Sequence, residues 1–267
     1  MWEKFLTEKK LEGMNNIERH FAQVMCALYF IFTARFTTAK ILQIATCRNT
    51  NGFANLLVQM KLLTKRKVLN YHIYGLTKLG ADFVCGTKFD TLRVSPSHVE
   101  HTLSMQRETL AATRLLGVED FEFEVSLMWL NEIYDFTDKL RSDSIWIRPT
   151  NEMLVEMELS AKNIKNGELD RFFQKILCHP TTIVFNDINI MIRYLRAASR
   201  YYKSGLPIWY KKDQKWVREE GNYHPEMIDW NRCHFKMLDD ETTDFINLQT
   251  YLEPDVSKHF IKEKHFL

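Results

Sequence analysis

Near the N-terminus the spacing of apolar residues changes once, and this change limits the folds that the chain can adopt. The spacing is three to four residues, as in an amphipathic helix, over residues 16–36, 39–45 and 52–63. It becomes two residues, as in a strand, over residues 64–69 and 71–76, and Thr77 caps a further helix toward Phe83. Three helices followed by a hairpin are typical of a winged helix-turn-helix, so the sequence predicts that fold here.

The first 96 residues carry a positive charge that the net charge of +2 conceals. They contain fourteen Lys and Arg against six Asp and Glu, a balance of +8, and the rest of the chain balances at −6. A basic module joined to an acidic one indicates a polyanion-binding domain attached to a domain with another role. We therefore expect a DNA-binding domain over residues 1–96 and a second domain over residues 97–267.

A winged helix places its third helix in the major groove of duplex DNA and lays its hairpin along the phosphates. The polar residues in and before the predicted third helix are candidate groove or backbone contacts: Arg48, Asn49, Asn51, Asn55 and Gln59. The cations in and before the hairpin are candidate phosphate partners: Lys61, Lys65, Arg66 and Lys67. The alternative is a solvated basic surface on a winged helix that binds another protein.

The second domain contains the segment SIWIRPTNEMLVEMELSAK at residues 144–162, which predicts a hairpin with its turn at residues 149–152. Apolar and polar residues alternate in the second strand, and its polar face carries Glu156, Glu158, Ser160 and Lys162. Two carboxylates beside an ammonium are suited to holding Mg²⁺ or Mn²⁺ at a reacting group. The alternative is an amphipathic edge strand whose charged face lies in water.

Helices and strands alternate around this hairpin, which predicts an α/β or α+β domain with a mixed sheet flanked by helices. We expect helices at residues 97–116, 127–140, 168–177 and 188–202. We expect strands at residues 181–185 and 206–210, and an apolar segment at residues 121–125.

The residues from Ile147 to Lys162, in which RP is followed by VEMELSAK, resemble the core motif of the replication-relaxation and MOBC-type relaxase group of plasmid mobilisation proteins. The resemblance follows the element order from about residue 17 to 210, and it is specific around residues 155–162 and at LTKLG, residues 76–80. It implies a winged helix joined to a PD-(D/E)xK restriction-endonuclease-like domain that nicks DNA at a transfer origin. It also implies Glu156 and Glu158 as metal ligands and Lys162 as an assistant at the scissile phosphate.

The chain departs from the family pattern, RPD followed by ExExSxK, because Thr150 stands where the pattern has aspartate. A hydroxyl does not supply the charge of a carboxylate, so Glu152 and Asp143 are the candidate replacements. The first hypothesis is a mobilisation protein that nicks duplex DNA with Mg²⁺ or Mn²⁺ and works with relaxosome or coupling proteins. The second is a catalytically degenerate DNA-binding accessory or regulator whose rear domain serves assembly. A third is a repressor whose rear domain mediates dimerisation.

Other features narrow the expected partners and compartment. The sequence contains no GxGxxG or GxxxxGK[ST] motif, so we expect no nucleotide cofactor. Residues 207–235 interleave aromatic and basic residues, which suits either stacking on single-stranded DNA or a lid over the sheet edge. The longest apolar run, residues 24–32, is shorter than the roughly 20 residues of a membrane span. Five scattered cysteines without a CxxC pair favour reduced thiols in the cytoplasm.

Overall fold

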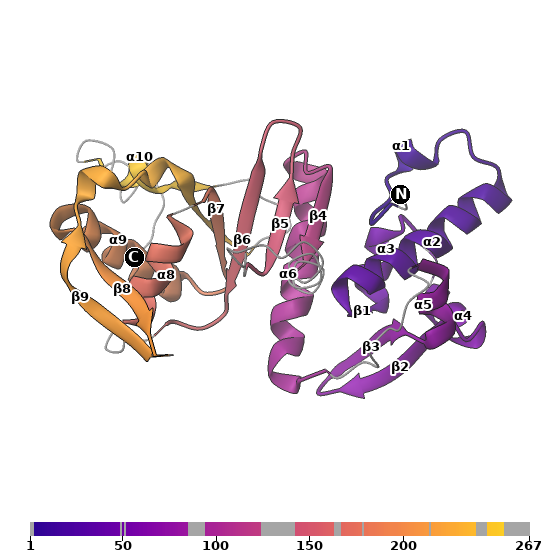
Figure 1. Ribbon diagram of the computed structural model, residues 1–267. Coiled ribbons are helices and arrows are strands. Elements are labelled where there is room, and N and C mark those ends of the chain that lie inside the picture. Colours follow the sequence, from indigo (N-terminus) through magenta and orange to yellow (C-terminus); the bar gives the residue numbers. More distant parts are fainter. Residues whose placement is uncertain are drawn as a thin grey trace. The chain divides into compact units, whose positions relative to one another are not determined.

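The computed structural model describes residues 3–48, 50, 52–84, 94–123, 142–162, 167–177, 179–213, 215–238 and 245–253. The chain divides into two compact units, Met1–Pro149 and Thr150–Leu267, and it combines helices with several sheets (Figure 1). The helix expected at residues 127–140 and the candidate contacts Asn49 and Asn51 lie outside the described residues.

Unit 1 begins with the helices and the hairpin that the sequence predicts, together with α1 and β1, which it does not predict. In chain order the elements are α1 (Glu8–Leu11), α2 (Asn16–Ala34), β1 (Phe36–Thr38), α3 (Ala39–Ala45), α4 (Phe53–Gln59), β2 (Leu63–Val68), β3 (Tyr71–Leu76) and α5 (Lys78–Val84). The three strands form an antiparallel sheet in the order β1-β3-β2, with Thr38 opposite Ile73 and Lys65 opposite Tyr74. The short strand β1, which no periodicity marks, joins the hairpin to the segment between α2 and α3.

Helix α4 is shorter than the helix predicted for residues 52–63. Lys61 has a left-handed φ of 61°, and the backbone N–H of Leu62 donates to the carbonyl of Leu57 at 3.0 Å. This is the hydrogen-bonding pattern of a Schellman motif, which stops a helix and turns the chain away from its axis. Leu63 therefore belongs to β2, and the prediction that the helix continues to it is wrong.

The rest of unit 1 consists of α6 (Pro96–Leu115) and the antiparallel pair β4 (Asp120–Phe123) and β5 (Ser144–Ile147). Pro96 is the first helical residue of α6, where its missing N–H costs no hydrogen bond. Buried hydrogen bonds connect α6 to both parts of the unit. Gln106 Nε2 donates to the carbonyl of Phe36 at 2.7 Å, and Trp146 Nε1 donates to Thr109 Oγ1 at 3.1 Å.

Unit 2 contains a mixed sheet in the order β11-β10-β7-β6, in which β6, β7 and β10 are parallel and β11 is antiparallel to β10. Its elements are β6 (Glu152–Glu158), α8 (Glu168–Ile176), β7 (Thr181–Phe185), α9 (Ile188–Ser204), β8 (Leu206–Lys212), β9 (Lys215–Tyr223), β10 (Cys233–Met237), β11 (Ile246–Asn247) and α10 (Leu248–Leu252). The predicted strand at residues 181–185 is confirmed, and the predicted helices at residues 168–177 and 188–202 are present with slightly different ends.

The core of unit 2 lies between this sheet and helices α8 and α9. Phe173 and Tyr194 from the helices pack on Ile183, Phe185 and Phe235 from the strands, and all five side chains are buried. All five residues of β7 are buried, as expected for a strand inside a parallel sheet. The hairpin of β8 and β9 forms a separate two-stranded sheet that lies on α8 (Figure 1). No helix among the described residues has the length and apolar character needed to cross a membrane.

Candidate functional site

Strand β6 holds the two glutamates that the sequence analysis selected. Glu156 is 7% exposed and Glu158 is 4% exposed, so both carboxylates are buried. The strand pairs in parallel with β7, where Glu156 lies opposite Ile183 and Glu158 opposite Phe185, on the face that packs against the helices. The alternative of an edge strand whose glutamates lie in water is therefore wrong.

Each buried carboxylate has a lysine as its ion-pair partner. Lys175, near the C-terminal end of α8, places Nζ 2.6 Å from Glu156 Oε1. Lys162 places Nζ 2.7 Å from Glu158 Oε1. The structure therefore brings Glu158 and Lys162 together, although β6 ends at Glu158 and the strand predicted to continue to Lys162 is too long.

The second oxygen of Glu158 accepts a hydrogen bond from a buried phenol. The Tyr194 hydroxyl, on α9, donates to Glu158 Oε2 at 2.8 Å. Burial, together with the neighbouring Glu158 carboxylate, raises the pKa of Tyr194 above its usual range. The phenol therefore stays protonated and remains a donor at physiological pH.

The loop that follows β6 is held against the two helices. The Lys162 ammonium lies 4.6 Å from the centroid of the Phe172 ring, and Arg193 Nη2 donates to the carbonyl of Lys162 at 3.0 Å. Neither Lys175 nor Tyr194 is predicted from the sequence as a site residue, because both stand at ordinary helical positions far from β6 in the chain. Only the packing of α8 and α9 on the sheet brings them to the carboxylates.

The described residues do not fit a divalent-cation site by themselves. Mg²⁺ requires carboxylate oxygens and waters in a nearly octahedral arrangement. In unit 2 one oxygen of each glutamate contacts an ammonium group instead, at 2.6 and 2.7 Å. Among the described residues there is no cluster of three or more His, Cys, Asp or Glu side chains that could hold a metal ion.

The candidate replacements for the missing aspartate lie apart from this pair. Glu152 is exposed at the other end of β6, four residues before Glu156 and so about 13 Å away along the strand. Asp143 in unit 1 pairs with His101, whose Nε2 lies 3.2 Å from Asp143 Oδ2. Thr150 is exposed in the turn before β6.

A second candidate surface is formed by α4 and the hairpin in unit 1. Lys65 and Lys67 alternate with Arg66 along β2, and all three side chains are exposed. The exposed polar side chains of α4 and of the turn that follows it are Asn55, Gln59 and Lys61. We call Asn55, Gln59, Lys61, Lys65 and Lys67 the basic face, since Arg66 points to the other side of β2.

Tyr74 connects the two parts of the basic face. Its hydroxyl donates to Asn55 Oδ1 at 3.1 Å, and its ring centroid lies 5.7 Å from Lys65 Nζ. Because Lys65 stands directly opposite Tyr74 in the sheet, both side chains lie on the same side of the hairpin. Helix α4 and the two lysines of β2 therefore present one surface.

Arg48 has partners that hold the turn before α4. Its Nη1 lies 3.0 Å from His20 Nδ1 and its Nε donates to Thr50 Oγ1 at 2.9 Å. Its guanidinium stacks over the Phe53 ring at 4.4 Å from the centroid. The side chain predicted to contact DNA is thus half-buried and packed at the N-terminus of α4.

No protein-family model and no curated protein matches this chain. The resemblance to the mobilisation proteins therefore rests on residues 147–162, on residues 76–80 and on the order of the elements.

Proposed function

We propose that the protein binds duplex DNA, and that unit 1 does so as a winged helix with α4 in the major groove. The observation that carries this proposal is the basic face, where exposed amides of α4 and exposed cations of β2 are joined through Tyr74. The order α2-β1-α3-α4-β2-β3 with the sheet order β1-β3-β2 supports it, because a recognition helix followed by a wing has this order.

The chemistry of the basic face divides into two tasks. Asn55 and Gln59 carry amides, which recognise adenine through paired donor and acceptor groups in the major groove. Lys61, Lys65 and Lys67 of this face, with Arg66 on the other side of the wing, supply four positive charges for phosphates. Four phosphate contacts make log K fall with log salt concentration at a slope of about −3.6.

For unit 2 we propose a role in assembly on DNA, without cleavage. Glu156 and Glu158 are each held by a lysine, and Thr150 stands where the relaxase pattern has aspartate. In this proposal the chain is a catalytically degenerate accessory or regulator related in role to the MOBC-type mobilisation proteins. Its expected ligand is the duplex of a transfer origin or a related site.

DNA binding is tested by fluorescence anisotropy with a labelled duplex over a range of salt concentrations. The variant Lys65→Ala/Lys67→Ala should bind at least tenfold more weakly, with a slope reduced by about 2. Arg196→Ala/Lys203→Ala removes two exposed charges from α9 in unit 2 and serves as the matched control. Equal affinities and slopes for wild type and the β2 variant would overturn the proposal.

The absence of cleavage is tested with supercoiled plasmid in the presence of Mn²⁺, with wild type beside Glu158→Ala. We expect wild type to bind the plasmid and leave it supercoiled. Relaxation by wild type that Glu158→Ala abolishes would overturn the accessory role and make β6 the centre of a metal-dependent nuclease. The DNA-binding proposal for unit 1 does not depend on this result.

A further inference from the structure

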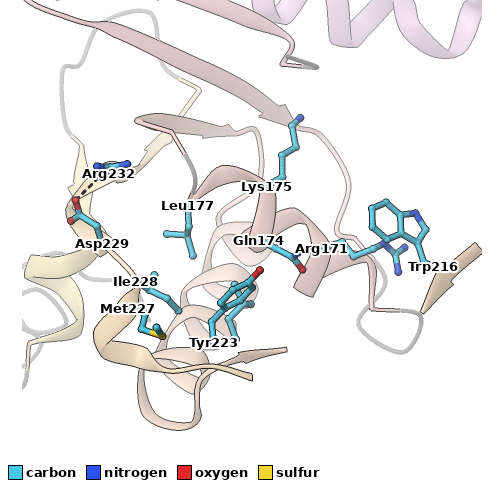
Figure 2. A pocket seen from close by; sticks show the side chains of 11 residues that line it. Arg171, Gln174, Lys175, Leu177, Trp216, Tyr223, Met227, Ile228, Asp229 and Arg232 are labelled. Atoms are coloured by element: carbon cyan, nitrogen blue, oxygen red, sulfur yellow. Dashed lines mark hydrogen bonds and ion pairs between the residues drawn. The ribbon is translucent and has the colours of Figure 1, made fainter. Parts of the chain in front are cut away.

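Unit 2 contains a pocket of about 550 Å³ between α8, the β8–β9 hairpin and the segment that follows β9 (Figure 2). Its wall combines cations, two aromatic rings and apolar side chains. It includes Arg171 and Lys175 from α8, Trp216 and Tyr223 from β9, and Met227 and Arg232 from the following segment. This pocket belongs to unit 2, whereas the basic face belongs to unit 1, and the function proposed above does not use it.

The hairpin that borders the pocket places rings and cations on one face. Trp209 lies opposite Arg218, and Lys211 lies opposite Trp216. Opposite residues of an antiparallel pair share a face, and alternate residues of one strand point the same way. The face therefore carries two indoles and two cations, to which α8 adds Arg171, whose guanidinium lies 5.2 Å from the ring centroids of both tryptophans.

The two tryptophans differ in their contacts within the protein. The Trp209 indole N–H donates to Asp170 Oδ2 at 3.3 Å, and its backbone exchanges two hydrogen bonds of 2.9 Å with the Gln174 amide. Trp209 thus fixes the hairpin to α8. Trp216 is 50% exposed and Tyr223 is also exposed. Packing on α8 leaves part of each of these rings open, and this open surface is available for stacking.

We propose that this pocket and the adjoining hairpin face bind single-stranded DNA. Trp216 and Tyr223 stack on unpaired bases, while Arg171, Lys211 and Arg218 contact the phosphates. Aromatic platforms beside cations bind single strands with little sequence preference, because every base has a π-face, whereas duplex bases are already stacked. The acidic residue of the pocket wall, Asp229, is engaged by Arg232 at 3.0 Å (Figure 2). This site is independent of the duplex-binding face.

The experiment measures the anisotropy of a fluorescein-labelled oligo(dT) of about 12 nucleotides, a length within the range of known single-strand sites. Trp216→Ala should raise Kd about tenfold, because one base loses its stacking partner. Trp216→Phe should restore most of the affinity, since it keeps an aromatic ring. Tyr210→Ala is the control: this exposed ring lies on the other face of the same hairpin, opposite Val217, and does not line the pocket, so its loss should leave Kd unchanged.

Two further measurements distinguish this site from the basic face of unit 1 and from a mononucleotide site. Lys65→Ala/Lys67→Ala should lose duplex affinity and keep oligo(dT) affinity, whereas Trp216→Ala should do the reverse. Unchanged oligo(dT) binding by Trp216→Ala, or its loss only in the β2 variant, would overturn the proposal. Displacement of oligo(dT) by dTMP at equal concentration would also overturn it, because the pocket would then be a mononucleotide site. Matching urea midpoints confirm that each variant is folded.

Discussion

The hydroxyl of Tyr194 donates a hydrogen bond of 2.8 Å to Oε2 of Glu158, and both side chains are buried. The bond joins α9 to the C-terminal end of β6. When a buried carboxylate oxygen loses its hydrogen-bond donor, the desolvation of that oxygen is no longer compensated. The resulting loss of stability is larger than the net contribution of an average hydrogen bond. The stability of unit 2 is therefore coupled to the neutral state of this phenol.

Tyr194→Phe should lower the free energy of unfolding by about 1–3 kcal/mol, because it removes the donor and keeps the ring. Urea unfolding followed by circular dichroism measures the change. Tyr202→Phe on the same helix is the control, since it preserves the ring contact with Trp230 and should change stability by less than about 0.5 kcal/mol. A Tyr194→Phe protein as stable as the control would show that the bond contributes nothing.

The same phenol predicts how stability depends on pH. Burial raises the pKa of Tyr194, and of Tyr201, whose hydroxyl donates to Asp170. Unfolded tyrosine ionises near pH 10, so above that pH the unfolded chain releases protons that the folded chain retains. The contribution of each phenol is therefore constant below about pH 10 and decreases by about 1.4 kcal/mol per pH unit above it.

Urea unfolding between about pH 9 and 11 tests this dependence against a Tyr194→Phe/Tyr201→Phe variant. The variant should lose less stability than wild type over this range. The buried thiols of Cys26 and Cys233, whose pKa values are also raised by burial, act in the same direction from about pH 8.5. They are present in both proteins and cancel in the difference. Parallel curves for the two proteins would contradict the prediction.

The sequence predicts the elements of this chain better than it predicts their contacts. The helix at residues 39–45 and the strand at residues 181–185 follow from apolar spacing and are observed with those bounds. The sequence also selects Glu158 and Lys162, but a continuous strand would hold them about 13 Å apart, and they pair only because β6 ends at Glu158. Lys175 and Tyr194 do not follow, since helical periodicity cannot tell which strand a helix will meet.

The end of α4 shows a second limit of prediction from the sequence. The sequence signal for a helix stop is usually glycine, which adopts the left-handed conformation without strain. Here Lys61 takes that conformation, and its side chain gives no sign of it. The apolar residues that follow keep a helical spacing through Leu63, so the pattern extends the helix into the strand.

The buried pair of Glu156 and Lys175 should show measurable coupling. Lys175→Met leaves a carboxylate that is almost fully buried next to an apolar group, while Glu156→Met/Lys175→Met removes the buried charge as well. Water around the half-exposed lysine screens the pair, so we expect a coupling energy near the lower end of about 0.5–3 kcal/mol. A double-mutant cycle by urea unfolding measures it. Additive effects would show that Glu156 is stabilised by its other contacts.

Gly80 should not tolerate a side chain. A Cβ at this position would lie 2.2 Å from the carbonyl oxygen of Leu62, so α5 would have to move away from the start of β2. Gly80→Ala should therefore destabilise the protein by about 1–3 kcal/mol despite the higher helix propensity of alanine. Thermal unfolding compares it with Leu79→Ala, which changes an exposed side chain of the same helix. A Gly80→Ala protein at least as stable as this control would contradict the close approach.

Tyr74 should affect the recognition of DNA sequence more than overall affinity. Its hydroxyl donates to Asn55 Oδ1 and thereby orients an amide on the proposed recognition helix, while Lys65 and Lys67 keep their charges without it. Tyr74→Phe should reduce the ratio of affinities for a selected duplex over a scrambled one severalfold, because base-edge contacts specify and phosphate contacts position. Competition binding on a duplex first selected with wild type from a random library measures this ratio. Tyr71→Phe, on the same strand, is the control, and an equal loss of affinity for both duplexes in Tyr74→Phe would show that Asn55 does not read bases.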